Sequence, residues 1–292
     1  MRYDAETQTW WFRQSWLNDA LGCNERGRRK IIEPEADSME GDAASAGTAA
    51  HAAVEFFLRN DGNVTIEEVV GVAAETAGRL ISETDIAYKS FDGPEELINH
   101  AVRCAEAWVR DIAPEVELGG LTEVPFRVLL FRRDNGVGVG VEGTCDYLPP
   151  SNSLLMDWKN AGRAFKQWEK QRADIQATTY CTAAVKGGLD SAWEAAGKTP
   201  PTYEWPMMFV FGNAIRGTKR AKGELVLVAR TEGHEYLLRD ILNRFVDMVE
   251  VLGLDRPWMV NPNYSLCSAK WCPWWDSCVG GHITTAEHTW KP

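Results

Sequence analysis

The spacing of apolar and polar positions along the chain predicts an order in which helices and strands alternate. Helices are expected near Gln8–Leu21, Ala43–Arg59, Thr65–Ser82, Pro94–Ile112, Lys166–Lys186 and Gly233–Leu252. Strands are expected at Leu121–Arg132, Gly138–Tyr147, Ser153–Asn160, Trp205–Gly212 and Glu224–Arg230. This order predicts an α/β fold with a mixed central sheet flanked by helices.

The expected strand Ser153–Asn160 brings an acid and an amine onto one surface. Successive side chains of a strand point to opposite faces, so Asp157 and Lys159 share one face and Trp158 the other. Asp146 ends the preceding expected strand, and the connection at 149–152, rich in turn-forming residues, allows the chain to double back. Two carboxylates and a lysine therefore converge.

This combination suits metal-dependent cleavage of a phosphodiester. Hard oxygen ligands hold Mg²⁺ or Mn²⁺, the metal polarises the phosphate and activates a water, and a cation helps to place the nucleophile. An Asp-x-Lys triplet alone is also common on exposed strands, so this interpretation depends on the rest of the chain.

Two helical segments add further candidates. Gly47-Thr48-Ala49-Ala50-His51 opens an alanine-rich stretch that favours a helix carrying His51 and Glu55 one turn apart. Gln176 and Tyr180 are also four residues apart, on the helix expected after the Asp-x-Lys strand. The order of a histidine helix, two acid-bearing strands and a Gln-x-x-x-Tyr helix resembles the PD-(D/E)XK nuclease superfamily and, within it, the RecB-like exonucleases.

The resemblance implies a restriction-endonuclease-like core and a divalent metal, Mg²⁺ or Mn²⁺. It assigns the metal to His51, Asp146 and Asp157, with the backbone carbonyl of Trp158 as a further ligand. Many relatives carry Glu where this chain has Asp157.

The catalytic set implied by the resemblance joins these two acids to three other side chains. Lys159 is expected to orient the attacking water, whereas Gln176 and Tyr180 border the active site and contact the nucleic acid or the lysine.

The cysteines form a second group. Cys267, Cys272 and Cys278 lie close together in a segment that also contains tryptophans and Pro273, and clustered thiols indicate a metal site. The sequence is similar here to the AddB and CRISPR-associated nucleases, in which one early cysteine, here Cys23, joins three late ones to hold a [4Fe–4S] cluster. Such a cluster would staple the two ends of the fold.

Zinc is the alternative for the same segment. Cys267, Cys272, Cys278 and His282 also match a permissive CCCH zinc-finger pattern, which leaves Cys23 free.

Length and composition are consistent with one nuclease domain. The 292 residues are 45% apolar, which is enough for a sizeable core. We expect a single domain over 1–292, with a catalytic core at about 43–230 and an iron–sulfur element formed by the Cys23 region and 264–282. The sequence shows no charged leader followed by an apolar stretch and no apolar run long enough to cross a bilayer, so a cytoplasmic protein is expected.

The net charge of −11 does not favour DNA binding, yet basic residues are clustered. The expected DNA contacts come from a run before the histidine helix and another after the catalytic lysine: Arg26, Arg28, Arg29, Lys166, Lys170 and Arg172.

These features predict a Mg²⁺- or Mn²⁺-dependent DNA exonuclease acting on single-stranded DNA or DNA ends, with 5′→3′ polarity favoured by the resemblance. Repair, recombination, spacer acquisition and phage DNA processing are the matching pathways, with recombination or CRISPR-type partner proteins. The alternative is a catalytically inactive nucleic-acid-binding module with a CCCH zinc site.

Overall fold

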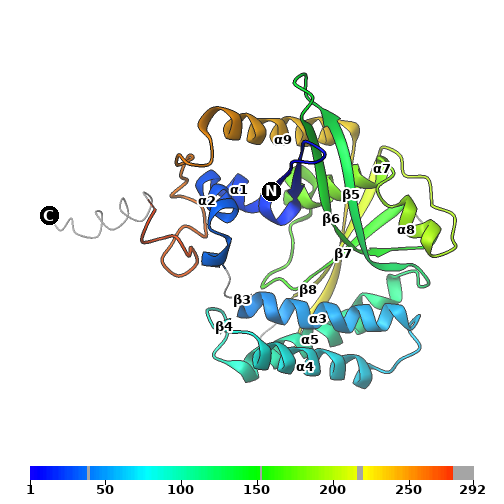
Figure 1. Cartoon of the computed structure of the whole chain (residues 1–292). Helices are drawn as coiled ribbons and strands as arrows, with labels where there is room; N and C mark the ends of the chain where they lie inside the picture. Colours follow the sequence, from blue (N-terminus) through cyan, green and yellow to red (C-terminus); the bar gives the residue numbers. More distant parts are fainter. Residues whose placement is uncertain (38–39, 152, 216–219, 279–292) are drawn as a thin grey trace. The chain divides into compact units, whose positions relative to one another are not determined.

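The structure, a computed structural model, describes residues 1–37, 40–151, 153–215 and 220–278 (Figure 1). The chain forms two compact units. The first combines Met1–Met39, Leu129–Val141 and Leu238–Pro292, and the second combines Glu40–Val128 and Glu142–Leu237. Strands β5 (Leu121–Arg132) and β6 (Gly138–Leu148) contribute residues to both units.

The main sheet is mixed, as the sequence predicts. Its strand order is β1-β2-β6-β7-β8-β9, and β5 pairs with β6. Strand β7 (Leu154–Lys159) is antiparallel to β6 and parallel to β8 (Met207–Ile215), whereas β9 (Lys222–Arg230) is antiparallel to β8. In the β7–β8 register, Asp157 lies opposite Phe211. The pairing of Tyr147 with Met156 shows that the chain doubles back after β6 as expected.

Three long helices of the second unit pack together over one face of the sheet (Figure 1). They are α3 (Asp42–Arg59), α4 (Ile66–Glu83) and α5 (Pro94–Asp111), each close to its predicted bounds. Small alanines of α3, including Ala46, Ala49 and Ala53, are fully buried and allow close helix packing. The indole of Trp158 reaches this core and packs edge-on against Trp108 of α5, with ring centroids 5.0 Å apart.

The opposite face of the sheet is covered by helix α7 (Ile175–Val185), which follows α6 (Gln167–Ala173). Tyr180 of α7 packs against Phe209 of β8, with ring centroids 6.1 Å apart. The short helix α8 (Asp190–Ala195) then leads back to β8. Because β7 alternates, Asp157 and Lys159 face α7 while Trp158 faces α5, which confirms the expected division of the strand.

The first unit contains β1 (Arg2–Asp4), β2 (Thr9–Arg13), α1 (Gln14–Gly22), α2 (Asn24–Ile32) and most of α9 (Glu232–Leu252). Trp16 of α1 packs against Phe245 of α9 and donates a hydrogen bond to the carbonyl of Gly27. Shorter elements complete the fold: β3 (Glu40–Gly41), β4 (Ile86–Ala87) and the 3-10 turns Pro34–Asp37 and Ala113–Glu115.

Two predicted helices were wrong in part. The helix expected at Gln8–Leu21 is a strand over its first half, because Trp11 and Phe12 belong to a β-favouring run that pairs with β1. The helix expected at Lys166–Lys186 is broken at Asp174, whose side chain caps α7 by accepting a hydrogen bond from the Ala177 amide at 3.0 Å. Helices α2 and α8 were not predicted. Across the residues described here, no helix combines the length and apolar character needed to cross a membrane.

Candidate active site and metal centre

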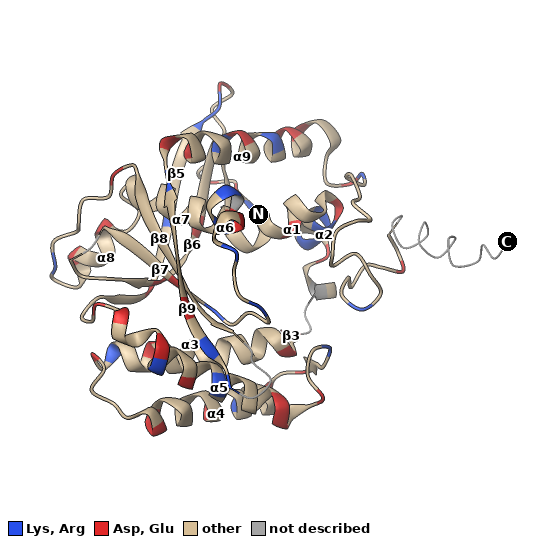
Figure 2. Cartoon of the chain, turned by 180° about the vertical axis from the view of Figure 1, so that it is seen from behind, with Lys and Arg blue, Asp and Glu red and all other residues tan. Residues whose placement is uncertain are grey.

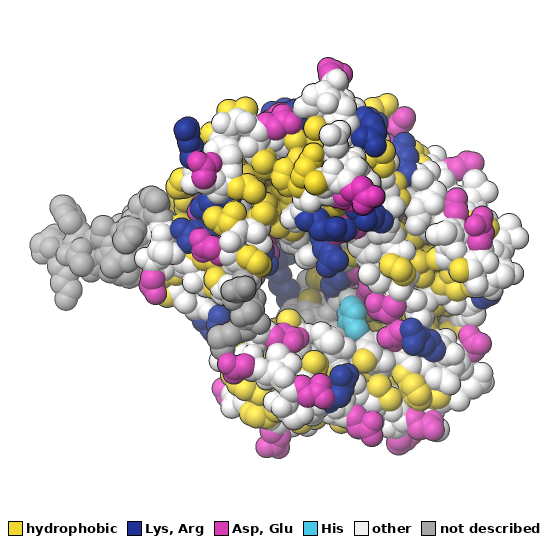
Figure 3. All heavy atoms as spheres, viewed as in Figure 1, with side chains coloured by type: hydrophobic (Ala, Val, Ile, Leu, Met, Phe, Trp, Pro, Cys, Tyr) yellow, Lys and Arg dark blue, Asp and Glu magenta, His cyan; other side chains and the backbone are white. Residues whose placement is uncertain are grey.

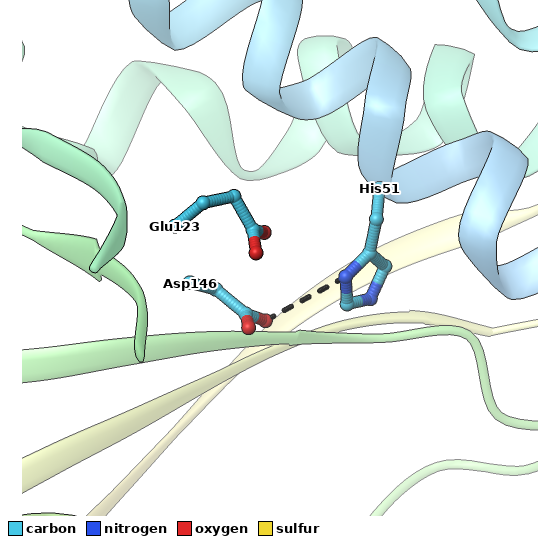
Figure 4. A group of neighbouring side chains, drawn as sticks. All are labelled: His51, Glu123 and Asp146. Atoms are coloured by element: carbon cyan, nitrogen blue, oxygen red, sulfur yellow. Dashed lines mark ion pairs between the residues drawn. The ribbon is translucent and has the colours of Figure 1, made fainter. Parts of the chain in front are cut away.

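A histidine and two carboxylates meet in the second unit (Figure 4). His51 comes from α3, Glu123 from β5 and Asp146 from β6, and one potential ligand atom of each lies within 4.8 Å of the others. Nδ1 of His51 is 3.7 Å from Oδ2 of Asp146. The carboxylate oxygens are the ligands that Mg²⁺ and Mn²⁺ prefer, and the imidazole adds one nitrogen donor of the kind that transition metals accept. The donor set present therefore fits the divalent metal that the sequence implied.

The second predicted acid lies next to the lysine of its own strand. Lys159 Nζ forms an ion pair with Asp157 Oδ2, and Gln176 Nε2 donates a hydrogen bond to Asp157 Oδ1. The backbone N–H of Trp158 donates to Asp146 Oδ2 at 2.7 Å, which ties β7 to the acid of β6. Residues that are more than 100 positions apart in the chain thus form one polar cluster.

Burial controls the charges of this cluster. It raises the pKa of Asp157 to about 7 and the pKa of Asp146 to about 6, although the Lys159 ammonium opposes both shifts. Burial, followed by the charge of Lys159, lowers the pKa of His51, which keeps the imidazole neutral and able to bind a metal. Burial disfavours the charged Lys159, but Asp157 and Asp146 outweigh it and raise the lysine pKa.

Glu123 is the member of the cluster that the sequence analysis missed. Its backbone has φ +50°, a left-handed conformation that is uncommon for residues other than glycine and typical of strained functional positions. Beyond it, Val124, Phe126 and Val128 are buried in regular alternation, so the irregularity is local. The sequence offered one signal for Glu123: it is an acid near the start of β5, the strand that comes before the strand of Asp146.

Glu55, one turn after His51, pairs with Arg59 at 2.5 Å. Burial raises the pKa of Glu123, and the charge of Glu55 adds to that rise while Arg59 opposes it. Both side chains therefore act electrostatically on the metal-binding group. In the space-filling view, one histidine side chain reaches the surface with acidic side chains beside it (Figure 3).

The two remaining predicted residues, Tyr180 and Trp158, have side chains on opposite faces of the sheet. Tyr180 is buried, with its ring edge-on to Phe126 at 5.2 Å, one turn beyond Gln176 on α7. Burial raises the pKa of its phenol strongly, so it stays protonated. The Trp158 side chain lies in the apolar core; the role of its carbonyl as a metal ligand stays a prediction.

A buried arginine fixes the break between α6 and α7. The Arg230 side chain is fully buried and donates to the carbonyl oxygens of Lys170, Gln171 and Asp174 and to Thr178 Oγ1. These acceptors belong to the end of α6 and the start of α7. The arginine of β9 thereby sets where α7 begins and how it presents Gln176.

The first unit contains the predicted thiol group. Cys23 lies between α1 and α2, and Cys267, Cys272 and Cys278 line the same small cavity of about 20 Å³. Burial and then the neighbouring Cys23, Cys272 and Cys278 thiols raise the pKa of Cys267. Arg26 Nη1 donates to the carbonyl of Trp271, which joins the early and late segments. His282 of the zinc alternative lies outside the described residues.

The predicted DNA-contacting arginines of α2 are engaged within the protein. Arg26 pairs with Asp19 at 2.9 Å, and both Arg28 and Arg29 pair with Glu25. Arg28 is only 5% exposed, and its Nη1 donates to the carbonyl of Leu254.

The basic residues that follow Lys159 in the chain are more accessible. Lys166 and Arg172 are exposed, whereas Lys170 pairs with Asp174 at 2.7 Å. Four acidic residues lie in the first turns of helices, where they interact favourably with the helix dipole: Glu67 and Glu68 in α4, and Glu95 and Glu96 in α5. Figure 2 shows acidic and basic residues distributed along the helices and loops.

Comparison with known proteins agrees with this geometry. A family model described as the PD-(D/E)XK nuclease superfamily matches residues 21–279, which include all residues of the cluster and of the thiol cavity. No curated protein matches the chain. Members of this superfamily use divalent metals to hydrolyse phosphodiester bonds. The chain belongs to the PD-(D/E)XK nuclease superfamily.

Proposed function

We propose that the protein is a RecB-like, metal-dependent deoxyribonuclease that removes nucleotides from single-stranded DNA or from DNA ends. The observation that carries the proposal is the convergence of His51, Glu123 and Asp146 beside the paired Asp157 and Lys159. A DNA-binding protein without catalysis has no use for a lysine paired with a buried acid next to a potential metal site.

The metal ligands in this proposal are His51, Glu123, Asp146 and Asp157. Mg²⁺ or Mn²⁺ bound there supplies Lewis acidity toward the phosphate and lowers the pKa of a water. The raised carboxyl pKa values mean that the free site partly holds protons near neutral pH, which a cation displaces on binding.

Lys159 acts as a cation. Because neighbouring acids raise its pKa, it stays an ammonium at neutral pH and donates hydrogen bonds to the attacking water and to phosphoryl oxygens as negative charge builds on them. Gln176 holds Asp157 in place through its hydrogen bond. The protonated Tyr180, one turn further along α7, borders the site.

The proposed occupant of the thiol cavity is a [4Fe–4S] cluster with a structural role, held by Cys23, Cys267, Cys272 and Cys278, because these four thiols line one cavity. The alternative is one zinc ion bound by Cys267, Cys272, Cys278 and His282.

In the cell, such an enzyme would process DNA ends during repair, recombination, spacer acquisition or the life cycle of a mobile element, with 5′→3′ polarity as the first hypothesis. DNA is the proposed substrate, and recombination or CRISPR-type proteins are the proposed partners.

The test is to incubate anaerobically purified protein with end-labelled linear and circular single-stranded DNA in Mn²⁺ or Mg²⁺. Asp157→Ala serves as the inactive control. Loss of linear DNA with wild type alone establishes the nuclease, survival of circular DNA makes it an exonuclease, and the released label gives the polarity. Binding without cleavage by the wild-type, cluster-loaded protein would refute the enzyme and favour a binding module.

A further inference from the structure

We infer that a cavity beside Glu123 is a subsite for one unpaired nucleotide next to the scissile phosphate, and that Arg59 contacts the phosphate of this nucleotide. The inference rests on the proposed function and names the part of the DNA strand that the site accepts. All residues of the cavity belong to the second unit.

The cavity has a volume of about 650 Å³ and reaches one member of the candidate metal site. Glu123 lines it, together with the preceding Leu121 and Thr122 of β5. Pockets of about 300–1,000 Å³ hold small molecules, so one nucleotide fits in this space. A ligand in the cavity therefore lies beside a proposed metal ligand.

Two basic side chains, Arg59 and Lys198, line the cavity together with the carboxylates of Asp61 and Glu123. Arg59 lies two helical turns after His51 on α3 and is held by Glu55 at 2.5 Å and by Thr122 Oγ1 at 3.2 Å. Its side chain is still 63% exposed. Lys198 also lines the cavity and donates to the carbonyl of Gly119. An anchored, exposed guanidinium is well suited to contact a phosphate.

The lining of the cavity also offers apolar surface for a base. Its apolar residues include Leu58, Val124, Pro125, Ala192 and Ala195. Apolar contact with a base face does not depend on sequence, which suits a nuclease without a recognition site. A base that enters such a cavity cannot stay paired in a duplex, so the subsite selects single strands or frayed ends.

One wall of the cavity is rigid. Tyr147 Oη accepts a hydrogen bond from the Gly120 amide at 3.0 Å and donates to the carbonyl of Glu117 at 2.6 Å. A Cβ at Gly120 would lie 2.1 Å from the carbonyl oxygen of Leu148, so only glycine allows this close approach. The cavity therefore exists before a substrate binds.

The first test compares Arg59→Ala with Arg79→Ala. Arg79 is a matched control, because it also pairs with a glutamate four residues along a helix and is 61% exposed, but it lies on α4 away from the cavity. Binding of fluorescein-labelled oligothymidylate is measured in EDTA over a range of salt concentrations. We expect Arg59→Ala to weaken binding several-fold and to reduce the salt slope by about 0.7, as for one lost phosphate contact.

The second test fills the cavity. Ala195→Trp places an indole in the space proposed for the base, whereas Ala196→Trp places it on the neighbouring exposed residue outside the lining. We expect Ala195→Trp to lose affinity for oligothymidylate and Ala196→Trp to keep it. Neither variant should change the affinity for blunt duplex DNA.

The outcomes separate the subsite from the nuclease. If wild type cleaves DNA but Arg59→Ala and Ala195→Trp bind like their controls, the subsite is refuted and the nuclease stands. If wild type binds without cleaving and both variants lose affinity, the subsite stands and the nuclease is refuted. If wild type does not bind oligothymidylate, the subsite is refuted whatever cleavage shows.

Discussion

Gln176 Nε2 donates a hydrogen bond to Asp157 Oδ1 and so fixes helix α7 to strand β7 at the active site. The Gln176 amide holds the carboxylate in one orientation, with the other oxygen paired to Lys159. Residues that orient metal ligands in this way are commonly needed for tight metal binding.

Gln176→Ala should therefore lower cleavage by about 10- to 100-fold, with an increase in the Mn²⁺ concentration needed for half-maximal rate. Gln167→Ala is the control, since Gln167 lies on the neighbouring helix and donates to the carbonyl of Leu227. Equal rates and metal requirements for the two variants would show that Gln176 has no positioning role.

Glu123 permits a test that separates backbone strain from metal binding. At φ +50°, glycine fits better than any residue with a Cβ, so Glu123→Gly should be more stable than Glu123→Ala by about 1 kcal/mol. Both variants lose the carboxylate and should bind Mn²⁺ more weakly than wild type. Urea unfolding and calorimetric titration measure the two effects, and equal stability of both variants would argue against strain at this position.

Manganese should stabilise the wild-type fold and not Asp146→Asn. A ligand at one hundred times its Kd adds about 2.7 kcal/mol to the free energy of unfolding. Because burial raises the pKa of Asp146 to about 6, protons compete with the metal below that pH. The increase in Tm with Mn²⁺ should therefore be larger at about pH 8 than at about pH 5.5, and a pH-independent increase would place the metal elsewhere.

The hydrogen bonds of Asp42, which lies outside the polar cluster, predict that the free energy of unfolding depends on pH. The carboxylate at the start of α3 accepts backbone hydrogen bonds from Ala43 and from Lys89, Ser90 and Phe91. Burial opposes ionisation, but these bonds hold the pKa below its ordinary value. The stabilisation is therefore complete above the unfolded-state pKa and is lost as the pH falls through the folded-state pKa.

Asp42→Asn should thus lower the free energy of unfolding by about 2–4 kcal/mol at neutral pH and by less near pH 3. Urea unfolding at both pH values measures the difference, with the exposed Glu67→Gln as control. A loss that is the same at both pH values would mean that hydrogen-bond geometry matters and the charge does not.

Iron content tests the thiol cavity. Cys23→Ala and Cys278→Ala should each purify anaerobically without the brown colour and with little iron, because each removes one of the four proposed ligands. Cys104→Ala is the control, since Cys104 is buried next to His100 in the second unit. Zinc in wild-type protein would instead support the CCCH alternative.

Local patterns were enough to predict most of the helices and the mixed sheet. They also predicted the order in which the helices and strands that carry the polar residues follow one another in the chain. Alternation along β7 separates Asp157 from Trp158, and alanine spacing defines α3 around His51. These features depend on neighbours within a few residues. They can be predicted because the hydrophobic period fixes which way each side chain points.

The features that were missed depend on contacts between distant segments. The break at Asp174 is stabilised by Arg230, which lies 56 positions away on another strand. The left-handed backbone of Glu123 has no signature such as glycine, and the strand at Trp11 is completed by pairing with β1 and β6. The local pattern of one segment does not show which strands it will pair with.

The thiol cavity also has a consequence for biosynthesis. Cys23 emerges early from the ribosome, whereas the segment that holds Trp271, which Arg26 contacts across 245 positions, is made late. The residues of the catalytic cluster all lie between these two segments. A translation product that stops after the polar cluster would therefore contain all of its side chains but could not hold the proposed iron–sulfur cluster. If the proposed function is right, cluster insertion acts as a late checkpoint on the nuclease.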